Sequence, residues 1–272
     1  MNFTKMQIKD EAFTKEEFSL KLNEDGILCT CPKPKNLSHY YEFGNYISHQ
    51  SDKKTNLHWI YNLVKKWMFT RKLNLIKKHH NEIHNILDFG CGTGDFIQYL
   101  KKKRFKTEGV EPTKLANHKA KEKGLKIYNC ISEVRDTFDV ITLFHVLEHV
   151  EDYNETLIKL KSRLGADGIL VIALPNYNSY DARYYKEKWA AWDVPRHLWH
   201  FDRNSVKQLA DKHNLELLQI KPMPLDAFYI SMVSERYRNQ SKLKGVLIGL
   251  LSNMEAWKTK QYSSLIYVLK QG

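Results

Sequence analysis

A glycine-rich turn after a short apolar run is the feature that most constrains what this chain can fold into. Residues 86–96 read Ile-Leu-Asp-Phe-Gly-Cys-Gly-Thr-Gly-Asp-Phe, with glycine at positions 90, 92 and 94. A strand that ends in a tight glycine turn, followed by a helix, lets a ligand lie against bare backbone near the N–H groups of the helix. The sequence therefore predicts a ligand-binding turn between a buried strand and a helix.

The spacing of the glycines separates this turn from a dinucleotide-binding loop. A dinucleotide fingerprint has glycine at its first, third and sixth positions. Counted from Gly90, the last glycine of this turn comes one position early, at Gly94, and Asp95 takes the sixth position. A carboxylate there disfavours a pyrophosphate, because both groups are anionic. The turn thus favours a cationic or zwitterionic ligand.

The segments that follow the turn alternate between strand and helix patterns. Apolar runs at 105–110, 125–130, 138–144 and 168–174 alternate with helical patterns at 95–103, 113–123 and 153–164. Such alternation predicts a parallel sheet with helices on both faces. Ligands of such sheets bind beyond the carboxyl ends of the strands, which is where the glycine turn lies.

The turn and its downstream landmarks together resemble the class I S-adenosylmethionine (SAM) dependent methyltransferases. These landmarks are the acid of Glu111-Pro112 after the second strand, the fourth strand ending at Phe144, and Pro175 after the fifth strand. The resemblance covers residues 57–220. It is nearest to an uncharacterised bacterial branch with an Arg-His pair after the fifth strand, and the core resembles ubiquinone-type methyltransferases.

This resemblance implies a doubly wound α/β fold with a seven-stranded, mostly parallel sheet, the Rossmann-like methyltransferase fold. SAM would be the cofactor and S-adenosylhomocysteine the product. We expect an N-terminal extension with a hairpin and an aromatic lid (1–55), a SAM-binding core (56–225), a helical insertion (226–261) and a final antiparallel strand (262–272).

The resemblance also assigns residues to the cofactor. Asp88 would receive the ammonium group of SAM, and Asp95 either shares that role or is a helix N-terminal carboxylate favoured by the helix dipole. Glu111 would hold the ribose hydroxyls. Relatives often hold the adenine with an acid after the third strand, where Ser132 or the backbone would act here. The expected cofactor set is Tyr46, Asp88, Gly90, Cys91, Gly92, Thr93, Gly94, Asp95, Glu111, Pro112, Ser132, Phe144 and His145.

Methyl transfer from a sulfonium needs an aligned acceptor, exclusion of water and, for an acceptor of high pKa, one base. His149, His197 and His200 are the candidate bases. Arg196 would bind an anionic group of the acceptor, with neighbouring tryptophans stacking on it. The alternative is that the loop 189–201 is locked by a buried polar network, since buried polar groups need partners.

Two patterns suggest metals, but neither predicts a metal site. His145-x-x-Glu148-His149 matches a zinc-protease pattern that requires a helix, not a strand exit. Ubiquinone-pathway relatives have Glu-x-x-Glu-His at this place, associated with a divalent cation, and His145 replaces the first Glu here. Cys29 and Cys31 are separated by one residue, whereas zinc pairs leave two or more. We therefore expect no metal ligands, with the divalent cation as the open alternative.

The formal net charge of +12 indicates either solvated basic helix faces or attraction to a polyanion. No aromatic-interleaved motif accompanies the charge, so a nucleic-acid partner is not expected. No apolar run approaches the ~20 residues of a membrane span, and the first residues lack a signal-peptide core, which predicts a cytoplasmic protein. The apolar run 243–251 predicts a helix packed on the domain or, alternatively, an interfacial anchor.

These observations predict a SAM-dependent methyltransferase that acts on a small-molecule acceptor, with oxygen favoured as the accepting atom. An RNA methyltransferase is the alternative suggested by the charge. A non-catalytic SAM-binding protein is the alternative from a different class. The sequence does not identify the acceptor or the oligomeric state.

Overall fold

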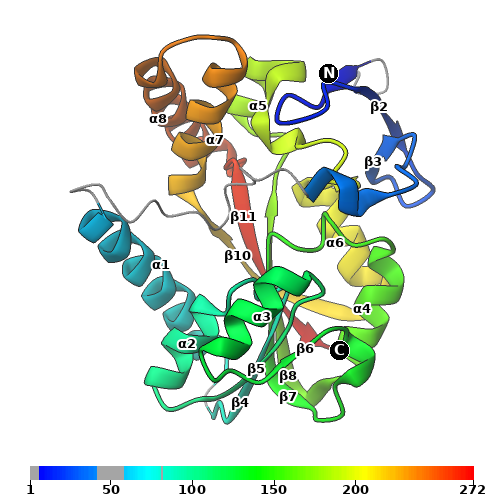
Figure 1. The fold of residues 1–272 in the computed structure, drawn as a ribbon, viewed down its shortest axis with the longest axis vertical. Coiled ribbons are helices and arrows are strands. Elements are labelled where there is room, and N and C mark those ends of the chain that lie inside the picture. The colour runs from blue at the N-terminus through cyan, green and yellow to red at the C-terminus, as the bar shows by residue number, and fades with distance from the viewer. Residues whose placement is uncertain (1–5, 42–57, 81) are drawn as a thin grey trace. The chain divides into compact units, whose positions relative to one another are not determined.

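A computed structural model describes residues 6–41, 58–80 and 82–272 of the chain. Tyr46, expected at the cofactor, lies outside these residues. The chain forms two compact units. The first unit contains Met1–Phe43, His145–Tyr153 and Ala173–Tyr267, and the second contains Gly44–Phe144, Asn154–Ile172 and Val268–Gly272. Figure 1 shows the order of the elements along the chain.

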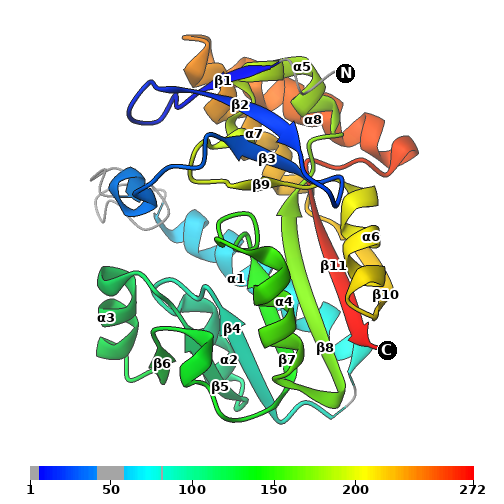
Figure 2. The same ribbon diagram turned by 90° about the vertical axis from the view of Figure 1, so that its right-hand side faces the viewer.

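The larger sheet has seven strands in the order β10-β11-β8-β7-β4-β5-β6. Their bounds are β4 Asn85–Phe89, β5 Lys106–Val110, β6 Ile127–Tyr128, β7 Phe138–Phe144, β8 Leu164–Pro175, β10 Leu215–Pro222 and β11 Ser264–Gln271. β4 pairs in parallel with both β5 and β7, and β5 pairs in parallel with β6. Figure 2 shows β11 running opposite to β8. The predicted fold class is therefore confirmed.

The helices α1 His58–His79, α2 Asp95–Lys102, α3 Lys114–Glu122 and α4 Tyr153–Lys161 alternate with these strands. α2 buries Phe96, Ile97 and Leu100 along one face, as its periodicity predicts. Gly94 lies at its N-terminus with φ 73, and a Cβ there would come within 2.4 Å of Cδ1 of Leu125. The last glycine of the turn is therefore required both by the left-handed backbone and by close packing.

A smaller sheet in the first unit has the order β1-β2-β3-β9. Its strands are β1 Gln7–Lys9, β2 Glu17–Leu22, β3 Leu28–Cys31 and β9 Trp199–His200. β2 and β3 form the hairpin predicted around Asp25-Gly26. β9 pairs with β3 through Leu28↔His200 and Cys29↔Trp199, so the loop after the fifth core strand joins the N-terminal extension.

The remaining helices are α5 Tyr180–Tyr185, α6 Arg203–Lys212, α7 Pro224–Tyr237 and α8 Lys242–Thr259. Short 3-10 segments occupy Leu37–Tyr41, Ile131–Glu133, Lys186–Lys188 and Ala190–Trp192. α7 and α8 cover most of residues 226–261, where a helical insertion is expected, and run side by side in Figures 1 and 2. Among the described residues, no helix combines the length and the apolar character needed to cross a membrane.

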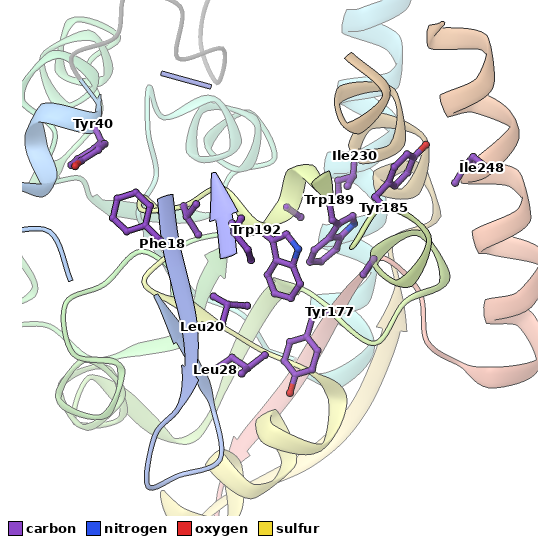
Figure 3. Close-up of a cluster of buried hydrophobic side chains, with 14 residues drawn as sticks. Phe18, Leu20, Leu28, Tyr40, Tyr177, Tyr185, Trp189, Trp192, Ile230 and Ile248 are labelled. Atoms are coloured by element: carbon purple, nitrogen blue, oxygen red, sulfur yellow. The ribbon is translucent and has the colours of Figure 1, made fainter. Parts of the chain in front are cut away.

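An aromatic core holds the first unit together (Figure 3). Phe18, Leu20 and Leu28 from the small sheet pack in one buried cluster with Trp189 and Trp192. Nε1 of Trp192 donates to the carbonyl of Lys186 over 2.7 Å, and Nε1 of Trp189 donates to Asp181 over 2.8 Å. Each buried indole N–H therefore has a partner, as burial requires.

Candidate functional site

The glycine turn in the second unit has a left-handed backbone conformation that residues other than glycine rarely adopt. Gly90, Gly92 and Gly94 have φ values of 73, 54 and 73. The N–H groups of Gly90 and Cys91 donate to the carbonyl of Val110 over 2.8 and 3.1 Å. These bonds tie the turn to the carboxyl end of β5, which is the edge where ligands of such sheets bind.

Glu111 lies directly against this turn. Its Oε2 accepts a hydrogen bond from the N–H of Gly92 over 2.8 Å, and its Oε1 accepts one from the N–H of Thr113 over 2.8 Å. The side chain is buried. Each carboxylate oxygen can accept more than one hydrogen bond, so both oxygens keep lone pairs for hydroxyl groups of a ligand. The structure thus brings together Glu111 and the turn.

Asp88 ends β4 as a buried carboxyl group that accepts a hydrogen bond from Oγ1 of Thr142 over 2.6 Å. Burial raises its pKa to about 6, although Thr142 and Lys72 act in the opposite direction. A cationic partner would favour the ionised form of this carboxyl. Sequence analysis did not identify Thr142, although its place on the adjacent strand β7 was available from the strand prediction.

The two carboxylate oxygens of Asp95 form ion pairs with two lysines. Its Oδ1 pairs with Nζ of Lys123 over 2.6 Å, and its Oδ2 pairs with Nζ of Lys65 from α1. Burial opposes ionisation, but the hydrogen bonds from Lys123 and Lys65 hold the pKa of Asp95 below its usual range. Because both oxygens are already paired, the geometry favours the helix N-terminal interpretation of Asp95 over contact with an ammonium group.

Phe144 and Phe96 form an aromatic wall in the second unit. Their ring centroids lie 5.5 Å apart at 86°. Nζ of Lys72, on α1, lies 3.5 Å from the centroid of the Phe144 ring. Because an ammonium group already covers this ring, the contact does not favour a sulfonium at the same face. Sequence analysis missed Lys72, although Lys65 and Lys72 are two helical turns apart and so share a face of α1.

The remaining cofactor candidates differ in how far they are exposed to solvent. Ser132 is exposed, with its Oγ 3.0 Å from Sγ of Cys130. Pro112 is exposed, and Cys91 and Thr93 are half-buried. Burial raises the pKa of the Cys91 thiol, so this residue contributes shape and backbone rather than a thiolate.

A second cluster lies in the first unit, and its first member, Glu148, comes four residues after Phe144 along the chain. Glu148, His149 and His197 each offer one atom suited to metal binding, and these three atoms lie within 4.8 Å of one another. Glu148 is buried, and neither carboxylate oxygen has a hydrogen bond among the described residues. Burial opposes ionisation, yet the contact with His145 lowers the pKa of Glu148.

Backbone carbonyls set the tautomers of the two histidines. Nδ1 of His149 lies 3.0 Å from the carbonyl oxygen of Arg196 and 2.9 Å from the hydroxyl of Tyr41, and Nδ1 of His197 lies 2.9 Å from the carbonyl oxygen of Ala191. A carbonyl can only accept, whereas a hydroxyl can accept or donate, so a protonated Nδ1 satisfies every one of these contacts and leaves a lone pair on each Nε2. Burial lowers the pKa of His197 to about 4, which keeps its ring neutral, whereas His149 is only half-buried.

His145 has a different charge state. Its Nδ1 lies 3.3 Å from Glu148 and its Nε2 lies 3.3 Å from Asp226. Burial opposes protonation, but the contacts with Asp226 and Glu148 raise its pKa to about 9. The imidazolium balances one of the two negative charges of these acids. A positive ring is a poor neighbour for a sulfonium, so the geometry favours His145 as the residue that orients Glu148.

Arg196 is buried and fully engaged by acids. Its Nη2 donates to Asp10 over 2.9 Å and to Asp193 over 2.8 Å, and its Nε donates to Asp193 over 3.0 Å. These contacts favour the second interpretation of the loop 189–201, a polar network that locks it. Sequence analysis missed Asp10, because no local pattern links it to a residue so far along the chain.

His200 belongs to the same network. Oγ1 of Thr30 donates to the carbonyl of His197 over 2.7 Å and lies 2.9 Å from Nε2 of His200. Since the hydroxyl proton is already used, Nε2 of His200 must donate. Burial holds the pKa of His200 well below its usual value. Of the three candidate bases, His149 alone combines an oriented Nε2 with partial exposure.

The cluster of Glu148, His149 and His197 could also hold a divalent cation. Two imidazole nitrogens and one carboxylate form a donor set typical of transition metals, and each histidine donates its other N–H to a carbonyl, as metal-binding histidines do. A cation would take the Nε2 lone pair of His149 that a base needs. The two roles therefore exclude each other, and the expectation of no metal stays a prediction.

The chain is similar to known methyltransferases. The model of a family described as methyltransferase domain matches residues 46–220, more than half of the chain. The ubiquinone biosynthesis O-methyltransferase of Rickettsia canadensis (strain McKiel) is 30% identical over 112 residues, which are 37% of this chain and 48% of that protein. The ubiquinone biosynthesis O-methyltransferase of Rickettsia bellii (strain OSU 85-389) is 25% identical over 165 residues, which are 54% of this chain and 68% of that protein. The match thus spans about half the length of the first relative.

One solved structure shows the shared fold. The plantazolicin methyltransferase BpumL, crystallised with a pentazolic desmethylPZN analogue and SAH, aligns with a TM-score of 0.50 and 18% identity. The alignment covers 75% of this chain and 85% of that one. At this identity the likeness concerns the fold.

Proposed function

The chain belongs to the class I SAM-dependent methyltransferases, and from that premise we propose that it transfers the methyl group of SAM to a hydroxyl oxygen of a small molecule. The observation that carries SAM binding is the hydrogen bond from the N–H of Gly92 to Oε2 of Glu111, and the base that we assign to the reaction is His149. Its Nδ1 proton is directed to the carbonyl of Arg196, so its Nε2 can accept a proton. The O-methyltransferase relatives support an oxygen acceptor.

In the proposed donor site, SAM lies along the glycine turn. The turn contacts the methionine portion through its backbone, and Asp88 pairs with the ammonium group. Glu111 accepts hydrogen bonds from both ribose hydroxyls, a role supported by the lone pairs left on its two oxygens. Phe144 is a proposed apolar contact of the cofactor. S-adenosylhomocysteine is the product.

In the proposed reaction, Nε2 of His149 takes the proton of the acceptor hydroxyl as the oxygen attacks the methyl carbon. The C–O bond forms while the C–S bond breaks, and the electron pair of that bond stays on sulfur as a neutral thioether. The new imidazolium is stabilised because its Nδ1–H donates to the carbonyl of Arg196 and because the buried Glu148 carboxylate belongs to the same cluster. His197 stays neutral.

The test separates donor binding from chemistry. Purified protein is titrated with SAM and then incubated with methyl-labelled SAM and a panel of phenols, alcohols, carboxylic acids and amines. We expect SAM binding and a labelled O-methyl product with release of S-adenosylhomocysteine. His149→Asn keeps a donor towards Arg196 but lacks the base, so it should bind SAM normally and lose about 10²–10⁴-fold in turnover.

The contrary results are distinct. Absence of SAM binding would overturn the methyltransferase function itself. Labelled N-methyl or C-methyl products would overturn the oxygen acceptor. SAM binding without transfer to any compound of a metabolite extract would favour a non-catalytic SAM-binding protein. Binding of RNA that weakens steeply with salt, with labelled RNA as product, would favour an RNA methyltransferase.

A further inference from the structure

α8 has two apolar faces of different character, and only one of them is covered in the first unit. The covered face carries small residues. A Cβ on Gly245 would come within 2.6 Å of Cα of Met232, and one on Gly249 would come within 2.8 Å of Cα of Phe228. α8 therefore packs against the backbone of α7 so closely that glycine is required at both positions.

Polar contacts fix α8 further along the same covered face. Oγ of Ser252 donates to Asp181 over 2.7 Å, and both residues are buried. The same carboxylate accepts from Nε1 of Trp189 and Oγ of Ser263. Nδ2 of Asn253 donates to the carbonyl of Pro224 over 2.9 Å. The helix is thus held by polar contacts on its covered face, which fix its rotation about its own axis.

The opposite face presents large apolar side chains. Leu243 is 79% exposed, Leu247 54% and Trp257 72%. At about 100° per residue, the exposed apolar positions fall within an arc of about 140°. We call this set the outer stripe; it consists of Leu243, Val246, Leu247, Leu250, Leu251, Met254 and Trp257. The run 243–251 predicts a packed helix or an interfacial anchor. The helix is packed and buries Ile248, but the other large side chains of this run are exposed.

Lysines predominate among the charged residues around the outer stripe, and Nζ of one of them, Lys244, lies 4.0 Å from the buried Glu235 of α7. Lys242 and Lys244 lie at its N-terminal end, and Lys258 and Lys260 lie at its C-terminal end. The single acid of α8, Glu255, is paired with Arg183. An apolar stripe with lysines at both ends and a tryptophan at its edge is the composition of helices that lie in the interface of an anionic bilayer.

We propose that the outer stripe of α8 docks the protein on an anionic lipid surface, with the helix lying in the plane of the interface. Lysine stems can extend along the apolar surface and place their charges among the lipid headgroups. The proposal is independent of the methyl-transfer chemistry, because it concerns binding alone. In this arrangement the lipid surface covers the outer stripe, and no membrane-spanning helix is required.

A second copy of the chain is the competing occupant. Leu243, Leu247, Leu250, Met254 and Trp257 alternate at intervals of four and three residues, which also suits a helix–helix seam. The flanking charges argue against it. An identical helix would bring Lys244 and Lys258 against lysines rather than acids, and like charges destabilise such pairs.

The test is co-sedimentation of the full chain, without SAM, with vesicles of phosphatidylcholine alone or of equal parts phosphatidylcholine and phosphatidylglycerol. We expect binding to the anionic vesicles, a blue shift of tryptophan emission that Trp257→Phe reduces, and weaker binding as salt rises. Leu247→Glu should weaken the partition about tenfold or more. Leu63→Glu is the matched control, since Leu63 is 55% exposed on α1 in the other unit.

Three outcomes would overturn the proposal. They are no binding to anionic vesicles, equal binding by wild type and Leu247→Glu, or a dimer in sedimentation velocity that Leu247→Glu dissociates. Circular dichroism of each variant confirms folding, since residue 247 contacts solvent rather than the core. SAM titration of the same variants keeps the result separate from the proposed function, because loss of vesicle binding with intact SAM binding concerns only the outer stripe.

Discussion

The backbone N–H of Gly92 donates a hydrogen bond to Oε2 of Glu111 over 2.8 Å. This bond joins the turn after β4 to the end of β5, two elements that parallel pairing already brings together. The carboxylate is therefore oriented by the turn before any ligand arrives. Preorganisation of this kind lowers the cost of binding, because less freedom is lost when the ligand arrives.

Substitution of Glu111 should separate donor binding from general stability. Glu111→Ala is expected to weaken SAM binding by about 1–3 kcal/mol, through loss of charge-assisted hydrogen bonds to the ribose. The measurement is calorimetric titration with SAM and with S-adenosylhomocysteine. Glu122→Ala, at an exposed acid of α3, is the control and should leave affinity unchanged. Unchanged affinity in Glu111→Ala would remove Glu111 from the site.

Removal of Arg196 should destabilise the fold. Arg196→Ala leaves Asp10 and Asp193 without their buried cation, which costs about 3–5 kcal/mol where a buried pair is broken. Urea unfolding measures the loss. Arg183→Ala removes the more exposed pair with Glu255 and should cost about 0–1 kcal/mol. A stable Arg196→Ala protein with normal SAM affinity but poor turnover would instead support the acceptor-binding role.

His197 should make stability depend on pH. Its folded pKa is about 4, whereas an unfolded histidine titrates near 6.5, so the unfolded chain binds the extra proton between these values. The free energy of unfolding should therefore be highest above about pH 6.5 and fall as the pH drops toward 4. Each pKa unit corresponds to about 1.36 kcal/mol, so the titration of His197 should change the free energy of unfolding by about 3 kcal/mol.

Urea unfolding between pH 4 and 7.5 measures this dependence. His197→Asn keeps a donor for the carbonyl of Ala191 but does not titrate, so its curve should be flatter over that range. His118→Asn is the control, because His118 is exposed on α3. A wild-type curve as flat as that of His197→Asn would contradict the expectation.

Chelation should distinguish the base from the metal ligand at His149. If Nε2 of His149 is the base, EDTA should leave turnover unchanged, and added Zn²⁺ or Ni²⁺ should inhibit by binding the cluster of Glu148, His149 and His197. Turnover with and without chelator, together with the metal content of the purified protein, checks this. Loss of activity on chelation that a divalent cation restores would mean that the cluster is a metal site.

Local patterns were sufficient for the core of the fold. The glycine turn, the strand 138–144 and the helix after the turn follow from hydrophobic periodicity and from backbone conformations that glycine permits. The β2–β3 hairpin follows from an Asp-Gly turn between alternating residues. Each of these depends on residues close together along the chain, where propensity and periodicity act directly.

The roles of the polar residues were less predictable. Arg196 and Asp10 meet across 186 positions of the sequence, and Thr30 reaches His200 across 170. The tautomer of His149 depends on one carbonyl of a distant loop. Burial then sets the charges, raising the pKa of Asp88 to about 6 and lowering that of His197 to about 4.

The sequence by itself determined the alternation of strands and helices in the core, the glycine turn and the acid beside it, because those depend on short-range periodicity and on glycine. Only the tertiary structure decided which histidine keeps an oriented, accessible nitrogen and which face of α8 is exposed. Both depend on contacts between distant segments. In α8 the apolar residues of 243–251 lie on both faces, and close packing at Gly245 and Gly249 places Ile248 on the buried face and the leucines on the exposed face.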